Sequence, residues 1–542
     1  MKLKKIFYLI KSLFSFYPPL NKLVIPPSFK KNKQISFLNK KNSKTIKTCI
    51  QLVRDPFYFL LFGAIILELQ KYLRVKNRAI VVQGISGSVG FNLRSEIQRA
   101  APIAWIWTMQ WVRAYGNTIL PKIAYRSSTW FYPLKDLHSL LDAICLWKKF
   151  KRIIVKSCSL KYHKIEIGDL VVDTYLRFRP SAKFIISDLF VLKIIWQAIR
   201  DIKKSERYFA KEKPDVYFTS NSVYLEHGIP VRVAIKYNIN TYTFGNARIF
   251  GKKLNKKDYY QNSHFDKYFQ LFNSLSKKRK KLKKAESYLN YRLSGKNDDA
   301  TVYMNNSTYL SDAIDIKLKK SFVVIFLHDF YDNPHVYKNF IFVDFMQWLL
   351  FTIKVLKKNN VNFYIKQHPN KITLNAKIIK ELKLLIPEEH WLPENINTKQ
   401  LISQGMRCGI TAYGTVAHEL AYLGVHSICC SNHPHHSFDF CKTAKNKKEY
   451  EFFLKKYYHS PLSKSEMRKQ ALAFYYIHNL YGTSNDMSIR SKFLELYKAC
   501  SNKKISWAKV FSRLDDLIGE NSFKKFCKKI ILENELIKIN KH

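Results

Sequence analysis

Hydrophobic and polar positions follow two alternating periods in the second half of the chain. Short apolar runs such as SFVVIFLHDF and NVNFYIKQHPN have the length and β-branched content of buried strands. Between them lie amphipathic stretches with a helical period, one ending at about Leu356 and another running from about Asn375 to Leu385. Regular alternation of β and α elements predicts a parallel, doubly wound α/β sheet.

The stretch RCGITAYGTVAHELAYLGVHSICC, from Arg407 to Cys430, follows this pattern most clearly. It predicts a strand, a turn at Tyr413-Gly414, a helix from about Thr415 to Leu423, and a second strand after Gly424. Backbone N–H groups at the start of that helix, together with the positive end of its dipole, suit a phosphate. The stretch is therefore a candidate anion site.

The first half repeats the pattern less regularly. A strand is predicted from Ala79 to Gln83, followed by a glycine-rich loop and a helix, which is how a Rossmann-like layer begins. A helix is predicted from Ile165 to Phe178. Further along, strands are predicted at Asp215 to Thr219 and at Ile239 to Phe244, with a polar loop and a helix between them.

These patterns divide the chain into five parts. At 542 residues it is too long for a single hydrophobic core. The predicted parts are a basic N-terminal helical or membrane-associating segment (1–77), an N-terminal Rossmann-like domain (78–273), a basic helical linker (274–300), a C-terminal Rossmann-like domain (301–460), and C-terminal helices with a basic tail (461–542).

Composition narrows the classes of partner. Hydrophobic residues make up 47% of the chain and aromatic residues 15%, which excludes wholesale disorder. The formal charge of +53 favours anionic partners, but none of the usual nucleic-acid-binding motifs occurs, so no nucleic acid is expected. Nine cysteines without a C-x-x-C pair favour a reducing, cytoplasmic compartment.

Two basic segments could contact an anionic membrane or could be solvated. Lysines recur from Lys2 to Lys47 before the first acidic residue, Asp55, so this segment either lies on an anionic membrane or is a solvated tail. The polybasic helix predicted from Ser274 to Leu293 has the same two interpretations. The most apolar run, Phe57 to Leu69, is shorter than the roughly 20 residues that a spanning helix needs. It is expected to form a buried or interfacial helix.

Candidate chemistry is strongest at His368 and near Glu419. His368 follows a predicted strand, and Pro369 holds it in an extended conformation. An imidazole there can donate to a phosphate oxygen or to leaving-group charge. On the predicted helix, Thr415 and Glu419 lie four residues apart on one face, and a carboxylate can accept hydrogen bonds from a ribose diol.

The first half offers further candidates, each with a structural alternative. Glu226 and His227 lie beyond the end of a predicted strand, where they could bind an acceptor or act as a base, or only pack at a helix entry. Asp169 and Asp173, four residues apart, could hold a sugar or brace a helix. The remaining weak acceptor candidates lie in a loop that could equally be a tight turn: Gly84, Ser86 and Gly87.

The loop from Ser431 to Phe440 carries His433, His435, His436 and Asp439. Three histidines near cysteines suggest zinc, but their spacing is not the paired spacing of common zinc sites. We therefore predict no metal site, and expect either a loop that contacts substrate or a polar loop without a role.

Three motifs carry a resemblance to a known family. IKQHPN, TAYGTVAHELAYLGVHSICC, and the His/Phe loop leading to Lys448-Glu449-Tyr450 resemble bacterial surface-carbohydrate and capsule-polysaccharide glycosyltransferases of GT-B fold. The chain is similar in particular to the capsule Kdo-transferase and polysialyltransferase group, whose His-Pro motif contacts the donor nucleotide phosphate. The resemblance covers roughly Ala79 to Tyr481. The chain departs from this family in one respect: it lacks an evident acidic pair followed by glycine, which is the base motif of polysialyltransferases.

The resemblance implies two Rossmann-like domains facing a cleft, with a helical C-terminal segment. It also implies metal-independent transfer of a sugar from a nucleotide-sugar donor, without a cofactor, to a lipid-linked or polysaccharide acceptor at the cytoplasmic membrane face. The donor would contact His368, Pro369, Tyr413, Gly414, Thr415 and Glu419. Two alternatives stay open: a UDP-sugar 2-epimerase, whose nucleotide site the Glu419 helix equally resembles, and a non-catalytic, membrane-associated glycan assembly factor.

Overall fold

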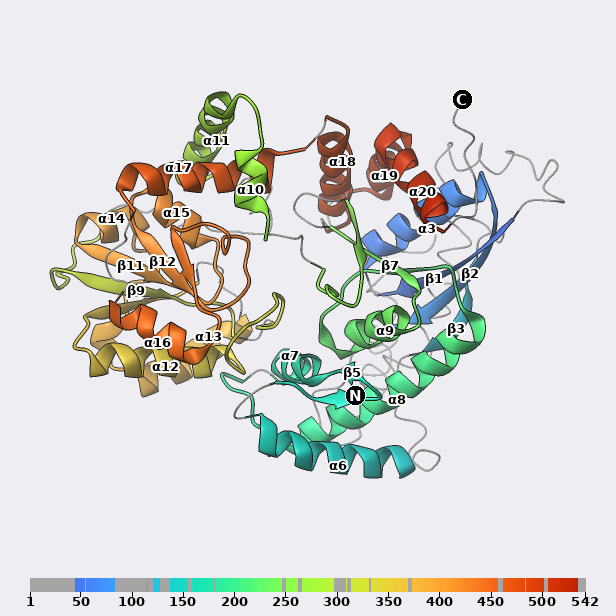
Figure 1. The fold of residues 1–542 in the computed structure, drawn as a ribbon, viewed down its shortest axis with the longest axis horizontal. Helices are drawn as coiled ribbons and strands as arrows, with labels where there is room; N and C mark the ends of the chain where they lie inside the picture. The colour runs from blue at the N-terminus through green and yellow to red at the C-terminus, as the bar shows by residue number, and fades with distance from the viewer. Residues whose placement is uncertain are drawn as a thin grey trace, which may run out of the picture.

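The fold is described from a computed structural model of the chain. The described residues are 44–53, 55–82, 115, 120–126, 137–154, 158–179, 181–245, 250–261, 266–296, 309, 313–330, 333–368, 373–456, 462–482, 484–501 and 505–534. Within these ranges, no helix is both long and apolar enough to span a membrane. The described residues form two α/β domains that lie side by side (Figure 1).

The first domain is built on a six-stranded sheet of order β3-β2-β1-β6-β7-β8. All neighbouring strands run parallel except β7 and β8. The strands are β1 (Thr45–Leu52), β2 (Arg74–Val81), β3 (Lys122–Arg126), β6 (Val216–Thr219), β7 (Asn240–Phe244) and β8 (Gly251–Leu254). The strand order reverses between β1 and β6, and ligands of doubly wound sheets bind at such a switch point.

The central strand of this sheet, β1, lies in the segment that the sequence analysis placed before the first domain. That assignment was wrong, because the domain begins at Thr45 instead of residue 78. The strand is hard to recognise because two of its buried residues are polar. Thr48 donates to Asn77 Oδ1 at 3.0 Å, and Gln51 is 1% exposed. Their side chains find partners inside the domain, so the strand is buried without an apolar pattern.

Helices cover both faces of the first sheet. On one face lies α3 (Pro56–Gln70), which confirms the buried helix expected there. Asp55 caps its first turn by accepting a hydrogen bond from the backbone N–H of Phe57 at 3.0 Å. Three C-terminal helices pack over α3: α18 (Ser484–Ser501), α19 (Trp507–Gly519) and α20 (Asn521–Glu533). On the other face lie α6 (Leu137–Ile153), α7 (Gly168–Phe178), α8 (Leu189–Glu212) and α9 (Tyr224–Lys236), beside the small hairpin β4 (Lys161–Tyr162) and β5 (Ile165–Glu166).

The second domain is built on a fully parallel sheet of order β10-β9-β11-β12-β13. Its strands are β9 (Phe322–Phe326), β10 (Phe363–Lys366), β11 (Met406–Ile410), β12 (His426–Cys429) and β13 (Cys441–Thr443). The predicted strands of this half are confirmed, and β13 is an addition. Here the order reverses between β9 and β11, which is the second switch point.

Helices also cover both faces of the second sheet. One face is covered by α12 (Phe345–Lys358), α13 (Thr373–Leu385) and α16 (Lys447–Lys456). The other is covered by α14 (Thr398–Ser403) and α15 (Val416–Tyr422), and then by α10 (Tyr268–Asn273), α11 (Lys278–Leu293) and α17 (Lys464–Tyr475). The short helices η3 (Glu388–His390) and η4 (Tyr476–Leu480) complete the domain.

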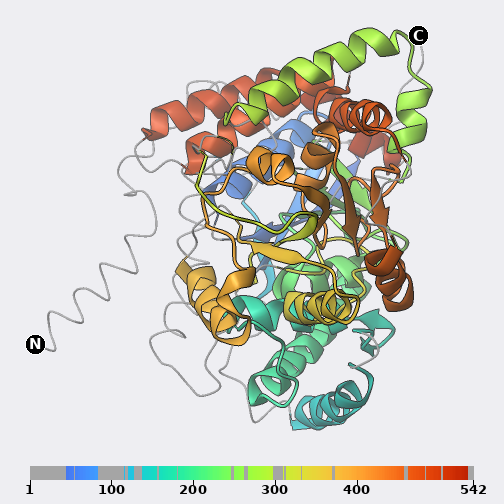
Figure 2. The same cartoon turned by 90° about the vertical axis from the view of Figure 1, so that its left-hand side faces the viewer.

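The helix α11 comes from the segment predicted to be a linker, but its inner face packs on this second domain. Leu289 and Leu293 are buried there, against α17. Figure 2 shows α11 lying along the top of the domain. Together the two sheets confirm the predicted class, two Rossmann-like domains as in GT-B enzymes with a helical C-terminal segment.

We expect the C-terminal helices to stabilise the first domain. Phe523 of α20 is fully buried in the core of that domain, so Phe523→Ala should lower the free energy of unfolding by about 3–5 kcal/mol. Leu532 on the same helix is 41% exposed, and Leu532→Ala should change it by only about 0.5 kcal/mol. Urea unfolding followed by circular dichroism measures both. Equal effects of the two substitutions would contradict the packing of α20 on this domain.

Candidate functional site

Polar residues gather at the carboxyl edge of the second sheet, next to its switch point. His328 and Asp329 follow β9, His368 follows β10, and Thr411 begins the turn after β11. Because these strands are parallel, their carboxyl ends lie at the same edge. We call these four residues, together with Tyr413, the edge cluster.

His328 is the centre of the edge cluster. Its Nε2 lies 2.9 Å from Thr411 Oγ1 and 3.4 Å from the backbone nitrogen of Tyr413. Since a backbone N–H can only donate, Nε2 carries the lone pair and the ring proton is on Nδ1. Burial, helped by the charge of His368, lowers the pKa of His328 to about 3. This ring is therefore neutral at physiological pH and holds the turn after β11 in place.

His368 is the more accessible of the two imidazoles. Its side chain is 26% exposed, and its Nδ1 lies 3.8 Å from Asp329 Oδ2. The sequence analysis predicted that His368 leaves the carboxyl edge of the sheet, and it follows β10 there. Pro369 lies outside the described residues. The contact of His368 with a donor phosphate stays a prediction.

The turn after β11 is as tight as predicted, but the helix that follows is shorter. The backbone N–H of Gly414 donates to Thr411 Oγ1 at 3.0 Å, and a Cβ at Gly414 would lie only 2.7 Å from that oxygen. Only glycine fits there without a shift. The helix α15 has seven residues, and Thr415, at its N-cap, makes no side-chain capping bond. A phosphate site here would depend more on the imidazoles than on the helix dipole.

Glu419 is held inside the protein. Its side chain is 9% exposed, one oxygen lies 2.6 Å from Nη2 of Arg292, and the other accepts from the hydroxyl of Tyr309 at 2.6 Å. Arg292 belongs to α11, so this ion pair joins α11 to α15. The sequence analysis proposed a ribose contact for Glu419 and did not foresee these two partners. A ribose diol would have to compete with both of them.

The switch point of the first sheet has a polar cluster of its own. Gln51, at the end of β1, accepts hydrogen bonds through Oε1 from the backbone nitrogen of Ser220 at 3.3 Å and from Nδ1 of His227 at 3.1 Å. Desolvation lowers the pKa of His227 to about 4, so the ring is neutral. Glu226 is buried in the first turn of α9. Both residues lie on the helix that follows β6, next to this switch point, and their roles as acceptor contact or base stay predictions.

Asp169 and Asp173 have structural partners, as the alternative interpretation of their spacing proposed. Asp169 forms a two-pronged ion pair with Arg232, with contacts of 2.7 and 2.5 Å. Asp173 is 1% exposed and lies 2.7 Å from Nδ1 of His335 in the second domain. Neither carboxylate is directed to solvent. The other acceptor candidates, Gly84, Ser86 and Gly87, lie outside the described residues.

Beside the Asp173–His335 pair, neighbouring segments of the two domains make a further polar contact. Close by, the backbone N–H of Phe184 donates to Asp344 Oδ2 at 2.7 Å, and the other oxygen of Asp344 caps α12. Burial opposes the charged form of His335, but the Asp173 carboxylate outweighs it and raises the pKa of His335 well above its ordinary value. The pair therefore ties α7 to the loop before α12 as an ion pair.

The histidine loop after β12 is mostly buried. His433 and His435 are fully buried, and His436 lies 2.7 Å from Asp266. Neither buried ring is available to a substrate. His433 and His435 therefore do not support the expectation that this loop contacts substrate.

The sequence analysis did not include His328, Asp329 and Thr411 among the site residues. The signal was present, because His328 and Asp329 directly follow the strand β9 just as His368 follows β10. Thr411 could not be recognised from its position alone, since its role depends on the ring of His328.

Comparisons with known proteins add little. No family model matches the chain, and no curated protein matches it. Among solved structures, the β-Kdo 2,4-transferase KpsC of Thermosulfurimonas dismutans is 12% identical, over 48% of this chain and 80% of its own, with a TM-score of 0.28. The UDP-GlcNAc 2-epimerase of Neisseria meningitidis is 11% identical over 83% and 99%, with a TM-score of 0.24. A glycotransferase of kitacinnamycin is 7% identical over 92% and 100%, with a TM-score of 0.19. At such values these similarities carry no argument about activity.

We expect the domain contact to weaken as the pH rises. Because the folded protein holds the pKa of His335 above its unfolded value, the stabilisation is fully present below about pH 6.5 and is lost as the pH rises through the folded pKa. The thermal unfolding midpoint of the wild type should therefore fall more steeply above that pH than the midpoint of the His335→Gln/Asp173→Asn variant.

A matched control is the exposed pair of His163 and Glu206, with 2.8 Å between Nδ1 and Oε2. The variant His163→Gln should keep the pH dependence of the wild type. An identical pH dependence in the wild type and the His335→Gln/Asp173→Asn variant would contradict the role of this pair.

Proposed function

We propose that the protein is a glycosyltransferase that moves a sugar from a nucleotide-sugar donor to a surface-polysaccharide acceptor, lipid-linked or free. The observation that supports this most is the edge cluster, in which two imidazoles and a carboxylate meet at the switch point of a parallel sheet. The resemblance of IKQHPN and TAYGTVAHELAYLG to surface-carbohydrate glycosyltransferases supports the same assignment.

In the proposed reaction the second domain binds the donor nucleotide. An acceptor hydroxyl attacks the anomeric carbon, the bond from that carbon to the phosphate oxygen breaks, and negative charge develops on the departing phosphate. His368, the more exposed imidazole of the edge cluster, donates a hydrogen bond to that phosphate. His328, which is neutral, fixes the turn at Tyr413 and Gly414 against which the nucleotide lies.

The first domain takes the acceptor in this proposal. Glu226 and His227 are the candidates for the base that receives the proton of the acceptor hydroxyl. In His227, Nδ1 donates to Gln51, so the lone pair is on Nε2 and is the only place on the ring that can accept a proton. No metal or cofactor takes part in the proposed chemistry.

The basic surface of α11 supports a location on an anionic membrane, at its cytoplasmic face. Its buried residues pack on the second domain, whereas the opposite side is exposed and strongly basic. The exposed residues of this surface are Lys277, Lys278, Arg279, Lys280, Lys283 and Lys284. Each basic residue near an anionic surface contributes about 1 kcal/mol, and a lipid-linked acceptor would be presented at that surface.

The function is tested by measuring sugar transfer with CDP-, CMP-, UDP- and GDP-sugar donors and a bacterial glycolipid acceptor. With the nucleotide sugar that the enzyme uses, His368→Asn should lower the rate constant of transfer roughly 10²- to 10³-fold. The reason is that the departing phosphate loses one hydrogen bond to its developing negative charge. The matched control is His390→Asn in the same domain, whose ring stacks on Phe363 away from the edge cluster. It should keep a rate near that of the wild type.

An unchanged rate in His368→Asn would contradict the proposed role of the edge cluster. Interconversion of the free donor without any acceptor would favour the epimerase alternative, and binding of glycan or lipid with no affinity for any nucleotide would favour the assembly factor.

A further inference from the structure

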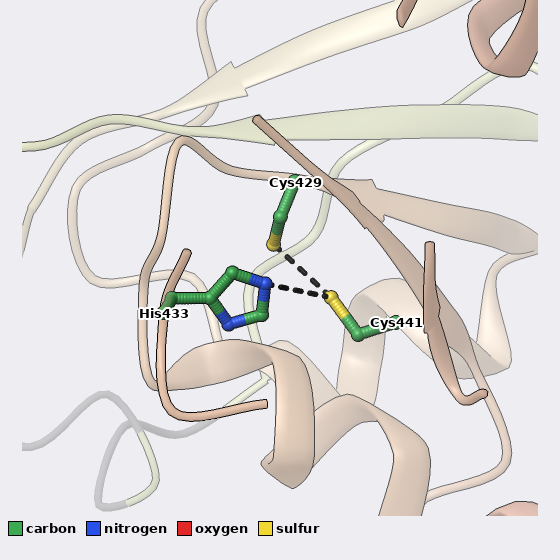
Figure 3. Close-up of side chains that lie close together, drawn as sticks. All are labelled: Cys429, His433 and Cys441. Carbon is green, nitrogen blue, oxygen red and sulfur yellow. Dashed lines mark hydrogen bonds between the residues drawn. The ribbon is translucent and has the colours of Figure 1, made fainter. Parts of the chain in front are cut away.

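Three potential metal ligands meet between the last two strands of the second sheet. Cys429 ends β12, Cys441 begins β13, and His433 lies in the loop that joins the two strands. One ligand atom from each of the three residues lies within 4.8 Å of the others. Figure 3 shows the two sulfur atoms and the imidazole turned toward one another.

The two separations from Cys441 can be compared with those of a tetrahedral zinc site. Zinc bonds of about 2.3 Å to sulfur and about 2.0–2.1 Å to nitrogen place two sulfurs about 3.8 Å apart, and a sulfur and a nitrogen about 3.6 Å apart. Cys441 Sγ lies 3.7 Å from His433 Nε2 and 3.1 Å from Cys429 Sγ. The distance from Cys441 Sγ to His433 Nε2 already has the required value, whereas the two sulfurs need to separate by about 0.7 Å.

The surroundings of His433 offer one acceptor that a metal-bound histidine needs, but they also hold the ring by two other hydrogen bonds. Its Nδ1 lies 2.9 Å from Nδ1 of His435, whose Nε2 is 3.1 Å from Nδ1 of His418. A metal-bound histidine normally donates its other ring N–H to such an acceptor. A metal on Nε2 would displace the hydroxyl of Thr443, which is now 2.8 Å from that nitrogen. Nδ1 would then carry the ring proton and could no longer accept a hydrogen bond from the backbone N–H of His435. Metal binding therefore competes with two hydrogen bonds.

We propose that Cys429, His433 and Cys441 bind a zinc-class divalent cation through two thiolates and one imidazole. These are the ligand types that zinc prefers. The three residues are buried and supply three of the four ligands of a tetrahedral shell. The ion closes the loop between β12 and β13 and so has a structural role, separate from the proposed transfer reaction. The prediction of no metal rested on the spacing of the histidines and nearby cysteines in the sequence, which does not show that Cys429, His433 and Cys441 meet in the fold.

The test uses the full chain, kept reduced, stripped with a chelator and then titrated with Co²⁺, whose absorption reports thiolate ligands and four-coordinate geometry. The wild type should bind one equivalent, give a thiolate-to-cobalt charge-transfer band, and lose the band on addition of one equivalent of Zn²⁺. Zn²⁺ should also raise the thermal unfolding midpoint of the stripped wild type.

Two variants and a matched control locate the site. Cys441→Ser and His433→Asn should lose the cobalt spectrum of the wild type. Cys430→Ser should keep it, because Cys430 adjoins Cys429 in sequence and is equally buried but packs in the core on the opposite face of the sheet. Circular dichroism establishes that each variant is folded. The titration of the wild type stands by itself if a variant does not fold.

Three results would overturn the proposal. One is a reduced wild type that gives no charge-transfer band. Another is a folded Cys441→Ser variant with the full wild-type spectrum. The third is a disulfide between Cys429 and Cys441 in protein purified without oxidant, found by peptide mapping, which would make the two cysteines a redox pair instead.

Discussion

The candidate site depends on one constraint, the parallel direction of β9, β10 and β11. Parallel strands end at the same edge of a sheet, so residues that are far apart in the sequence meet there. His328 and Thr411 are 83 residues apart and are joined by a 2.9 Å contact. The reversal of strand order between β9 and β11 leaves room at that edge for a ligand, and the same argument applies to Gln51 and His227 in the first sheet.

Buried polar contacts join parts of the chain that are distant in sequence. Asp173 and His335 join the two domains, and Arg292 and Glu419 join α11 to α15. A buried charge without its partner is strongly destabilising, whereas the pair tolerates burial. In these contacts, acidic residues that were candidates for ligand binding are instead internal partners. The C-terminal helices add a third connection by packing on the first domain.

Much of the second domain could be predicted from sequence because short apolar strands alternate there with amphipathic helices. Phe322–Phe326 is buried at every position, and the neighbouring strands β10 and β11 are each buried at all positions but one. The strand β1 could not be recognised in this way, since Thr48 and Gln51 are buried through partners that come from elsewhere in the chain. The site was predictable as far as it follows strand ends, as at His368. The partners of Glu419 and the meeting of Cys429 with Cys441 depend on tertiary packing, which sequence spacing does not encode.

The most direct test of the central claim is a crystal structure of the protein with a bound donor nucleotide, chosen from CDP, CMP, UDP and GDP by calorimetry. The account predicts a phosphate oxygen within about 3.2 Å of a ring nitrogen of His368, with the nucleotide at the carboxyl edge of β9 and β11. A nucleotide bound at the first sheet instead, or bound to the second domain away from His368, would contradict it.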